Sequence, residues 1–213
     1  MVARGSRLQV DERRAQLLEL GLRLFSERAY DEISIDDIAR EAGVSKGLLY
    51  HYFGGKRAFY VACVEQAAQG LVETLLATES ERDPEGARIG LTAYFDFAQA
   101  HRLAYRTLMR SGIGNDPEVV AILDTARGAI AQNMLSNMGL DGERRPVFRA
   151  AAVGWIGMVE ATCLDWLDAG TPTRDELVML LLGSLWGTLA SAKLVDPDAE
   201  LELDTPSPFK GFD

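Results

Sequence analysis

The 213-residue sequence has few of the residue types from which disulfide frameworks and metal sites are built. It holds only two cysteines and two histidines, and Cys63 and Cys163 lie a hundred positions apart within apolar stretches. This separation favours free buried thiols over a disulfide or a metal knuckle. We therefore expect a reducing, cytoplasmic setting and no metal or other cofactor.

The sequence also lacks the motifs of common enzyme classes. It contains no Cys-x-x-Cys, no Gly-x-Ser-x-Gly and no Gly-x-Gly-x-x-Gly after a strand, and its only histidines are His51 and His101. Gly112-Ile113-Gly114 is an isolated loop between helices. These absences argue against an enzyme.

Targeting and membrane segments are missing as well. No basic segment followed by an apolar stretch opens the chain, so no signal peptide is expected. The longest uncharged stretch, residues 177–192, is interrupted by glycine, serine and threonine and falls short of the ~18 apolar residues of a membrane span. The expectation is a soluble protein with no membrane partner.

Excess positive charge is lacking overall, because the net charge is -10. Its distribution is uneven: residues 1–60 carry ten Lys/Arg and nine Asp/Glu, whereas residues 61–213 carry twelve and twenty-three. The N-terminal quarter is therefore the part that is electrostatically suited to nucleic acid.

Strand signals are scarce, and apolar residues recur at intervals of three and four, which predicts an all-α fold. Ser34 with Asp37 and Thr173 with Glu176 fit capping boxes, and Ser45 fits an N-cap. The expected helices span about residues 12–28, 35–42, 46–52, 56–78, 84–100, 102–110, 117–139, 143–169 and 174–193.

The ends of the chain read differently. Residues 1–10 contain Arg4 and Arg7 without an acid before Asp11, which suggests a flexible basic arm that reaches a DNA groove or phosphates. Residues 194–213 alternate acids with Pro, Ser and Gly, which predicts a disordered acidic tail. A calcium loop at Asp196, Asp198 and Glu200 is not supported, since Leu201 stands where such a loop needs glycine.

A helix, a glycine-containing turn and a second helix span residues 35–52, which is the helix-turn-helix pattern of DNA-binding proteins. Ala39 is small where the helices cross, Gly43 permits the turn, and Val44 and Leu49 face the core. The outward residues Lys46 to His51 are unusual for a merely solvated surface. An ordinary helical hairpin with an aromatic core is the alternative interpretation.

The stretch from Arg13 to Phe59 resembles the N-terminal domain of TetR-family transcriptional repressors. The matching residues are Ala39, Gly43-Val44-Ser45-Lys46, Leu49-Tyr50 and the aromatics and lysine that follow. The similarity covers about a quarter of the chain. It implies a homodimer that binds a double-stranded DNA operator and whose C-terminal helices bind a small molecule that releases the DNA.

The resemblance assigns residues to DNA by position. Tyr50 and His51 are implied phosphate contacts, Lys46 and Gly47 approach bases or backbone, and Lys56 anchors the next helix to phosphate. Free N–H groups at helix starts can also take phosphate oxygens. Leu48 stands where the family often has Thr, Ser or Ala, Arg57 replaces a frequent acid, and Phe59 replaces a frequent Leu. The expected DNA-binding residues are Ser34, Ser45, Lys46, Gly47, Leu48, Tyr50, His51 and Lys56, within a helix-turn-helix domain over residues 11–56.

Residues 57–193 are expected to form a ligand-binding and dimerisation domain. The last two long helices are apolar on several sides, and a helix apolar all round must be covered all round. Small residues at Ala150, Gly154, Gly157 and Ala161, and at Gly183, Gly187 and Ser191, allow close helix approach. We expect a four-helix dimer interface, with purely internal packing as the alternative.

Aromatic residues and methionines recur at helical spacing between the helix-turn-helix domain and the last two long helices. Such a stripe usually forms only hydrophobic core, but the resemblance favours a cavity for a lipophilic effector. Asp96, His101 and Glu160 are its polar candidates, and Glu160 either hydrogen-bonds across the dimer interface or anchors the ligand. A helical lipid carrier that does not bind DNA is the alternative function. The expected ligand-binding residues are Tyr94, Phe95, Tyr105, Met109, Trp155, Met158 and Glu160.

Overall fold

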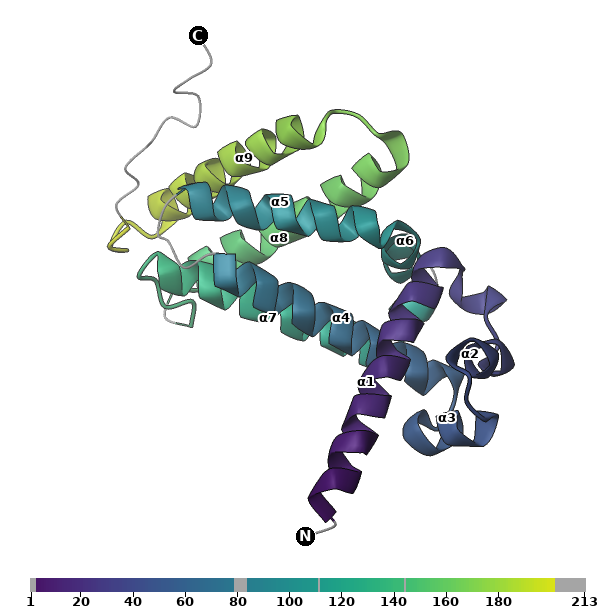
Figure 1. Cartoon of the computed structure of the whole chain (residues 1–213). Helices are drawn as coiled ribbons and strands as arrows, with labels where there is room; N and C mark the ends of the chain where they lie inside the picture. The colour runs from purple at the N-terminus through teal and green to yellow at the C-terminus, as the bar shows by residue number, and fades with distance from the viewer. Residues whose placement is uncertain (1–2, 79–83, 111, 144, 202–213) are drawn as a thin grey trace. The chain divides into compact units, whose positions relative to one another are not determined.

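The computed structural model describes residues 3–78, 84–110, 112–143 and 145–201, and within these ranges every regular element is helical (Figure 1). This confirms the all-α fold class. The elements are α1 (Ala3–Glu27), η1 (Tyr30–Glu32), α2 (Ile35–Ala42), α3 (Lys46–Phe53), α4 (Lys56–Thr78), α5 (Pro84–Ala100), α6 (Arg102–Arg110), η2 (Gly112–Asn115), α7 (Pro117–Asn137), α8 (Pro146–Ala169) and α9 (Arg174–Val195).

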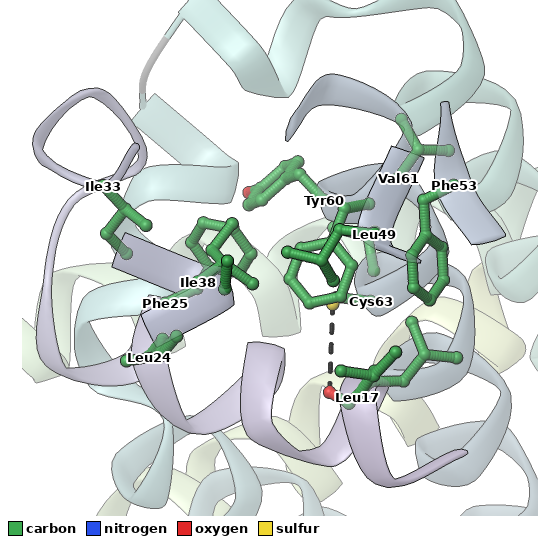
Figure 2. Packing of buried hydrophobic residues seen from close by; sticks show 14 of the residues in the cluster. Leu17, Leu24, Phe25, Ile33, Ile38, Leu49, Phe53, Tyr60, Val61 and Cys63 are labelled. Atoms are coloured by element: carbon green, nitrogen blue, oxygen red, sulfur yellow. Dashed lines mark hydrogen bonds between the residues drawn. The ribbon is translucent and has the colours of Figure 1, made fainter. Parts of the chain in front are cut away.

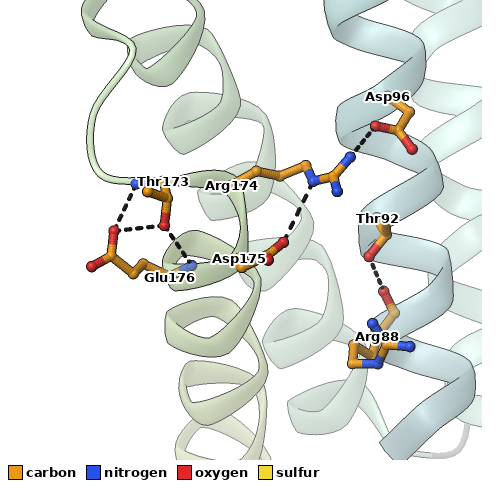
Figure 3. Close-up of polar contacts among 7 residues, drawn as sticks. All are labelled: Arg88, Thr92, Asp96, Thr173, Arg174, Asp175 and Glu176. Atoms are coloured by element: carbon orange, nitrogen blue, oxygen red, sulfur yellow. Dashed lines mark hydrogen bonds and ion pairs between the residues drawn. The ribbon is translucent and has the colours of Figure 1, made fainter.

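Both predicted capping boxes are confirmed. The Ser34 hydroxyl accepts from the Asp37 N–H at 3.1 Å, and the Ser34 N–H donates to Asp37 Oδ2 at 2.9 Å. Thr173 and Glu176 repeat this arrangement at the start of α9, with corresponding distances of 3.3 and 2.7 Å (Figure 3). Gly43 ends α2 at φ +63°, a conformation that a residue with a Cβ adopts with strain.

The two ends of the chain differ from expectation. Residues 3–10 belong to α1, because residues 3–11 include no proline and mostly tolerate helix, so no stop signal precedes Glu12. The side chains of Arg4 and Arg7 lie outside the described residues, as do residues 202–213. At the other end, residues 196–201 are packed rather than disordered, since Arg145 pairs with Asp196 and Ala199 is 1% exposed.

The chain forms two compact units, and helices α4 and α7 contribute residues to both. The first unit comprises residues 1–70 and 100–123, and the second comprises residues 71–99 and 124–213. The first unit is thus larger than the expected domain over residues 11–56. It includes α6 because α6 packs on α1, a tertiary contact that sequence periodicity does not reveal.

The core of the first unit joins α1 to α4 (Figure 2). Leu17 and Phe25 of α1 are buried with Leu49 of α3 and Phe59 of α4. Gly21 permits this packing, because a Cβ there would lie 2.6 Å from Phe59 Cζ and would also collide with Cys63 Sγ. The helix-turn-helix is therefore anchored to α1 and α4 by close-packed apolar contact.

In the second unit, α8 and α9 lie side by side (Figure 1). Trp155 of α8 donates its indole N–H to the carbonyl of Leu181 on α9 at 2.9 Å, so the buried polar atom is satisfied. Arg174, at the start of α9, pairs with Asp96 of α5 (Figure 3). These contacts tie α9 to both α8 and α5.

Candidate functional site

Helix α3 has one buried and one exposed face. Leu49 is fully buried and Phe53 is 8% exposed, and Val44 packs partly buried against the same core. We call the exposed residues Lys46, Gly47, Tyr50 and His51 the α3 outer face; Tyr50 is 48% exposed. Leu48 beside them is half-buried. The packing thus presents a cationic and aromatic surface on a rigid support, which suits major-groove recognition.

Lys46 is not simply solvated. Its ammonium lies 2.9 Å from Asp36 Oδ2 in the first turn of α2, and the hydrogen bond to Asp36 raises the pKa of Lys46. Both side chains remain exposed, so a phosphate that approached Lys46 would compete with Asp36 for its ammonium. Sequence reasoning missed Asp36, although an acid and a base in the first turns of two helices joined by a tight turn are a readable signal.

The start of α2 is a poorer phosphate site than expected. The Ser34 N–H is already used by Asp37, and hydrogen bonds from Ser34 and Arg40 hold the pKa of Asp37 far below its usual range. Two carboxylates, Asp36 and Asp37, therefore occupy the end of the helix where an anion would bind. Helix α3 has no acid in its first turn, and Ser45 caps it by accepting from the Leu48 N–H at 3.2 Å.

The cations at the start of α4 have intramolecular partners. Lys56 donates to the Tyr30 carbonyl at 2.8 Å and lies 4.0 Å from the centroid of the Tyr30 ring, so its ammonium fastens η1 to α4. Arg57 forms a fork to both carboxylate oxygens of Asp116, at 2.6 and 2.7 Å, and also contacts Glu118 at 3.0 Å. Arg57 thereby joins the first turn of α4 to the first turn of α7.

The second unit contains a cavity of about 790 Å³. Of the predicted ligand residues, Tyr94, Trp155 and Glu160 line it. The lining is predominantly apolar and is drawn from α4, α5, α7, α8, α9 and the segments after α7 and α9: Leu75, Ala87, Gly90, Leu91, Tyr94, Ile130, Met134, Asn137, Met138, Trp155, Ile156, Val159, Glu160, Leu182, Leu185, Trp186, Leu189, Lys193, Glu200 and Leu201.

The other predicted ligand residues lie elsewhere. Phe95 is fully buried and packs edge-on against Trp166, with 5.3 Å between ring centroids. Tyr105 and Met109 belong to α6 in the first unit, and Met158 is 37% exposed on α8. A helical stripe does not reveal which neighbour each side chain meets, so periodicity alone could not separate core from cavity. Trp186, Lys193, Glu200 and Leu201 were not predicted.

The polar candidates are already paired within the chain. Arg127 Nε donates to both carboxylate oxygens of Glu160 at 2.9 and 3.1 Å, an intrachain partner that neither expected role for Glu160 included. Asp96 pairs with Arg174. His101 lies outside the cavity, in the first unit, where its Nδ1 is 3.0 Å from Ser26 Oγ and burial lowers its pKa.

Helices α8 and α9 also expose an apolar stripe. Val153 is 44% exposed on α8, and Leu180 and Leu194 are 55% and 85% exposed on α9. A Cβ at Gly157 or Gly187 would meet no atom within 4 Å, so these small residues do not serve packing inside the chain. Contiguous exposed apolar surface is typical of interfaces.

Comparisons with known proteins agree with this geometry. Residues 17–63 match the model of bacterial regulatory proteins of the tetR family, and residues 85–188 match that of the tetracyclin repressor-like C-terminal domain. The HTH-type transcriptional activator FasR of Mycolicibacterium smegmatis is 30% identical over 200 residues, covering 90% of this chain and 89% of FasR. The chain belongs to the TetR family of transcriptional regulators.

Other relatives of this TetR-family regulator fit the same assignment. The HTH-type transcriptional regulator HbdR of an Aromatoleum species is 53% identical over 47 residues, covering 22% of this chain and 20% of HbdR. The crystal structure of a tetR-family transcriptional regulator from Streptomyces coelicolor superposes with a TM-score of 0.79 at 32% identity, covering 88% of this chain and 85% of that one.

Membership settles the class of activity. TetR-family regulators are non-enzymatic, DNA-binding, soluble cytoplasmic proteins, typically homodimers that respond to small molecules. The chain is therefore a DNA-binding regulator rather than a carrier without DNA binding. Helices α8 and α9 are long and apolar enough to cross a membrane by length and composition, which is weak grounds for a span and does not conflict with this assignment.

Proposed function

We propose that this TetR-family regulator is a repressor that binds an inverted-repeat operator as a homodimer and releases it when a lipophilic effector enters the cavity of the second unit. The observation that carries the proposal is the presence of both an anchored α3 outer face and a largely apolar cavity of about 790 Å³ in one chain.

The DNA surface consists of the α3 outer face with Leu48 and Ser45. Lys46 supplies a donor for base edges or phosphates, Tyr50 and His51 supply phosphate contacts, and Gly47 allows close approach of the backbone. Lys56 contributes positive charge from the start of α4, and Ser34 contributes least because its N–H is used by Asp37.

The apolar stripe of α8 and α9 is the dimer interface in this proposal. A two-fold dimer presents two α3 helices, and these fit successive major grooves when they lie about 34 to 36 Å apart. The operator is then an inverted repeat. Because each half-site neutralises several phosphates, affinity falls steeply with increasing salt.

The effector is proposed to be lipophilic, with no fixed charge that needs a counter-ion in the cavity. Arg127 already neutralises Glu160, and Tyr94, Trp155 and Met134 offer aromatic and thioether surface. Release of DNA requires the ligand to bind one conformation more tightly than the other, since equal affinity shifts no population.

The test combines three measurements on the full chain. Footprinting and gel shifts on DNA upstream of the coding sequence should give a symmetric, salt-sensitive site, and Tyr50→Ala should weaken binding while Glu19→Gln, an exposed change on α1, should not. Lipophilic compounds that raise the melting temperature should release this DNA. A promoter reporter should rise when the protein is removed. An asymmetric site, hits that never affect DNA binding, or a reporter that falls would each refute the corresponding part.

A further inference from the structure

The six residues after α9 form a compact structure. We call residues 196–201 the C-terminal clasp. The Ala199 N–H donates to the Asp196 carbonyl at 3.4 Å, and the Leu201 N–H donates to the Ala199 carbonyl at 2.9 Å. Ala199 is 1% exposed, so this residue anchors the clasp in the second unit, whereas Pro197, Asp198 and Glu200 are exposed.

Two cations, Arg145 and Lys193, hold the clasp. Arg145, immediately before α8, donates to Asp196 Oδ1 at 2.6 Å and to the Asp198 carbonyl at 2.9 Å. Lys193, in the last turn of α9, donates to the Ala199 carbonyl. The Arg145–Asp196 pair is partly buried, with 29% and 21% of the side chains exposed, so it is screened less than a fully exposed pair.

The clasp also contributes to the cavity. Glu200 and Leu201 line it together with Lys193 of α9, and apart from Met138 in the turn after α7 the rest of the lining comes from helices. One part of the cavity wall therefore depends on a non-helical segment that is fastened by Arg145. Leu201 adds apolar surface there, and Glu200 and Lys193 add the polar groups of that part of the wall.

From this arrangement we infer that the C-terminal clasp is a functional part of the effector site, in which Leu201 contacts the apolar body of a lipophilic ligand and Arg145 is a positioning residue. The inference rests on the proposed effector cavity. The proposed ligand contact lies in a segment whose composition predicts a solvated tail.

The experiment measures binding of the neutral fluorophore N-phenylnaphthylamine to five full or shortened chains. They are the wild type, a chain ending at Leu201, a chain ending at Val195, Arg145→Gln, and Arg149→Gln as the control, an exposed charge one turn further along α8. Circular dichroism and gel shifts on the upstream DNA verify that each chain is folded.

The wild type, the chain ending at Leu201 and Arg149→Gln should bind the fluorophore equally. The chain ending at Val195 should bind about tenfold more weakly, as expected for loss of a buried apolar contact. Arg145→Gln should be intermediate, and it keeps the inference testable if the shortened chain fails to fold. If the chain ending at Val195 and Arg145→Gln both bound the fluorophore as tightly as the wild type or more tightly, the role of the clasp would be refuted while the proposed cavity would stand. If the wild type did not bind the fluorophore, the proposed cavity would be refuted, and the role of the clasp with it.

Discussion

At the scale of single residues, the Asp36–Lys46 pair offers a direct test of the DNA surface. Asp36 lies 2.9 Å from the Lys46 ammonium and places negative charge at the surface that must meet phosphates. Asp36→Asn should therefore tighten binding to operator and unrelated DNA by about threefold to tenfold at low salt, with the gain shrinking as salt screens it. Lys46→Ala should weaken binding.

Gel shifts at several salt concentrations provide the measurement for this pair. Glu19→Gln removes an exposed acid from α1 and should leave both affinities close to the wild type. If Asp36→Asn weakened binding instead, the carboxylate would be orienting Lys46 for DNA rather than competing with it.

Two glycines inside helices should respond in opposite ways to alanine. At Gly21 the new Cβ would lie 2.6 Å from Phe59 Cζ, and overpacking should lower the free energy of unfolding by about 1 to 3 kcal/mol. At Gly47 the nearest atom would be Ser45 Oγ at 3.9 Å, so the gain in helix propensity, about 0.5 to 1 kcal/mol, should stabilise the protein.

Urea unfolding measures the free energy of unfolding of both glycine variants, and gel shifts measure their DNA binding separately. Gly47→Ala should stabilise the chain yet weaken DNA binding, because its methyl group would stand on the α3 outer face. A variant at Gly21 as stable as the wild type would show that α1 and α4 separate without cost.

At the scale of helices, the capping box of α9 predicts a pH dependence. Hydrogen bonds from Thr173 lower the pKa of Glu176 in the folded chain. This stabilisation is present above the unfolded pKa of about 4.3 and is lost as the pH falls through the lowered folded value. Thr173→Ala should reduce the melting temperature by about 2 to 4 °C at neutral pH and by less near about pH 3.

Thermal melts across this range check the prediction. Glu65→Gln, which removes an exposed acid on α4, serves as the control. It should have the same difference in melting temperature between neutral and acid pH as the wild type. An equal loss at both pH values would mean that Thr173 acts only through its packing and not through the Glu176 carboxylate.

The exposed stripe of α8 and α9 predicts that a substitution there can weaken dimerisation without changing the fold of the subunit. A Cβ at Gly187 meets nothing within 4 Å in the single chain, so Gly187→Leu should not disturb the fold of the subunit. In the proposed dimer it inserts a side chain twice across the two-fold axis, which should raise the dimer dissociation constant by at least about tenfold.

Sedimentation velocity over a concentration series detects this change. Gly128 on α7 is equally open, so Gly128→Leu controls for the added leucine. A monomeric wild type at micromolar concentration would refute the interface, and an unaltered Gly187→Leu dimer would place the contact on another surface.

At the scale of the whole molecule, α4 and α7 each contribute several residues to both units, and Arg57 joins their first turns through Asp116 and Glu118. Given the proposed effector response, Arg57→Gln should change DNA affinity without effector by less than about threefold. It should reduce effector-induced release by about tenfold, since coupling energies of this kind are of order 1 to 3 kcal/mol.

DNA affinity with and without a stabilising lipophilic compound measures this coupling. Arg23→Gln on α1 removes an exposed charge without touching α7 and should preserve the response. If Arg57→Gln lowered both affinities equally, Arg57 would serve DNA binding alone.

Much of the fold was predictable because its signals are local. The capping residues Ser34 and Thr173 and the positive-φ Gly43 act within one helical turn, so the starts of α2 and α9, the helix-turn-helix and its outward residues could be predicted from the sequence alone. The family motif within residues 13–59 predicted the same helix-turn-helix.

The rest depended on contacts between distant parts of the chain. It is the packing of the helices that brings Glu160 to Arg127 and places Phe95 in the core and Leu201 at the cavity. A periodic pattern states which face of a helix is buried, but not which helix covers it. Partners and cavities arise from that choice, because they depend on which surfaces pack together.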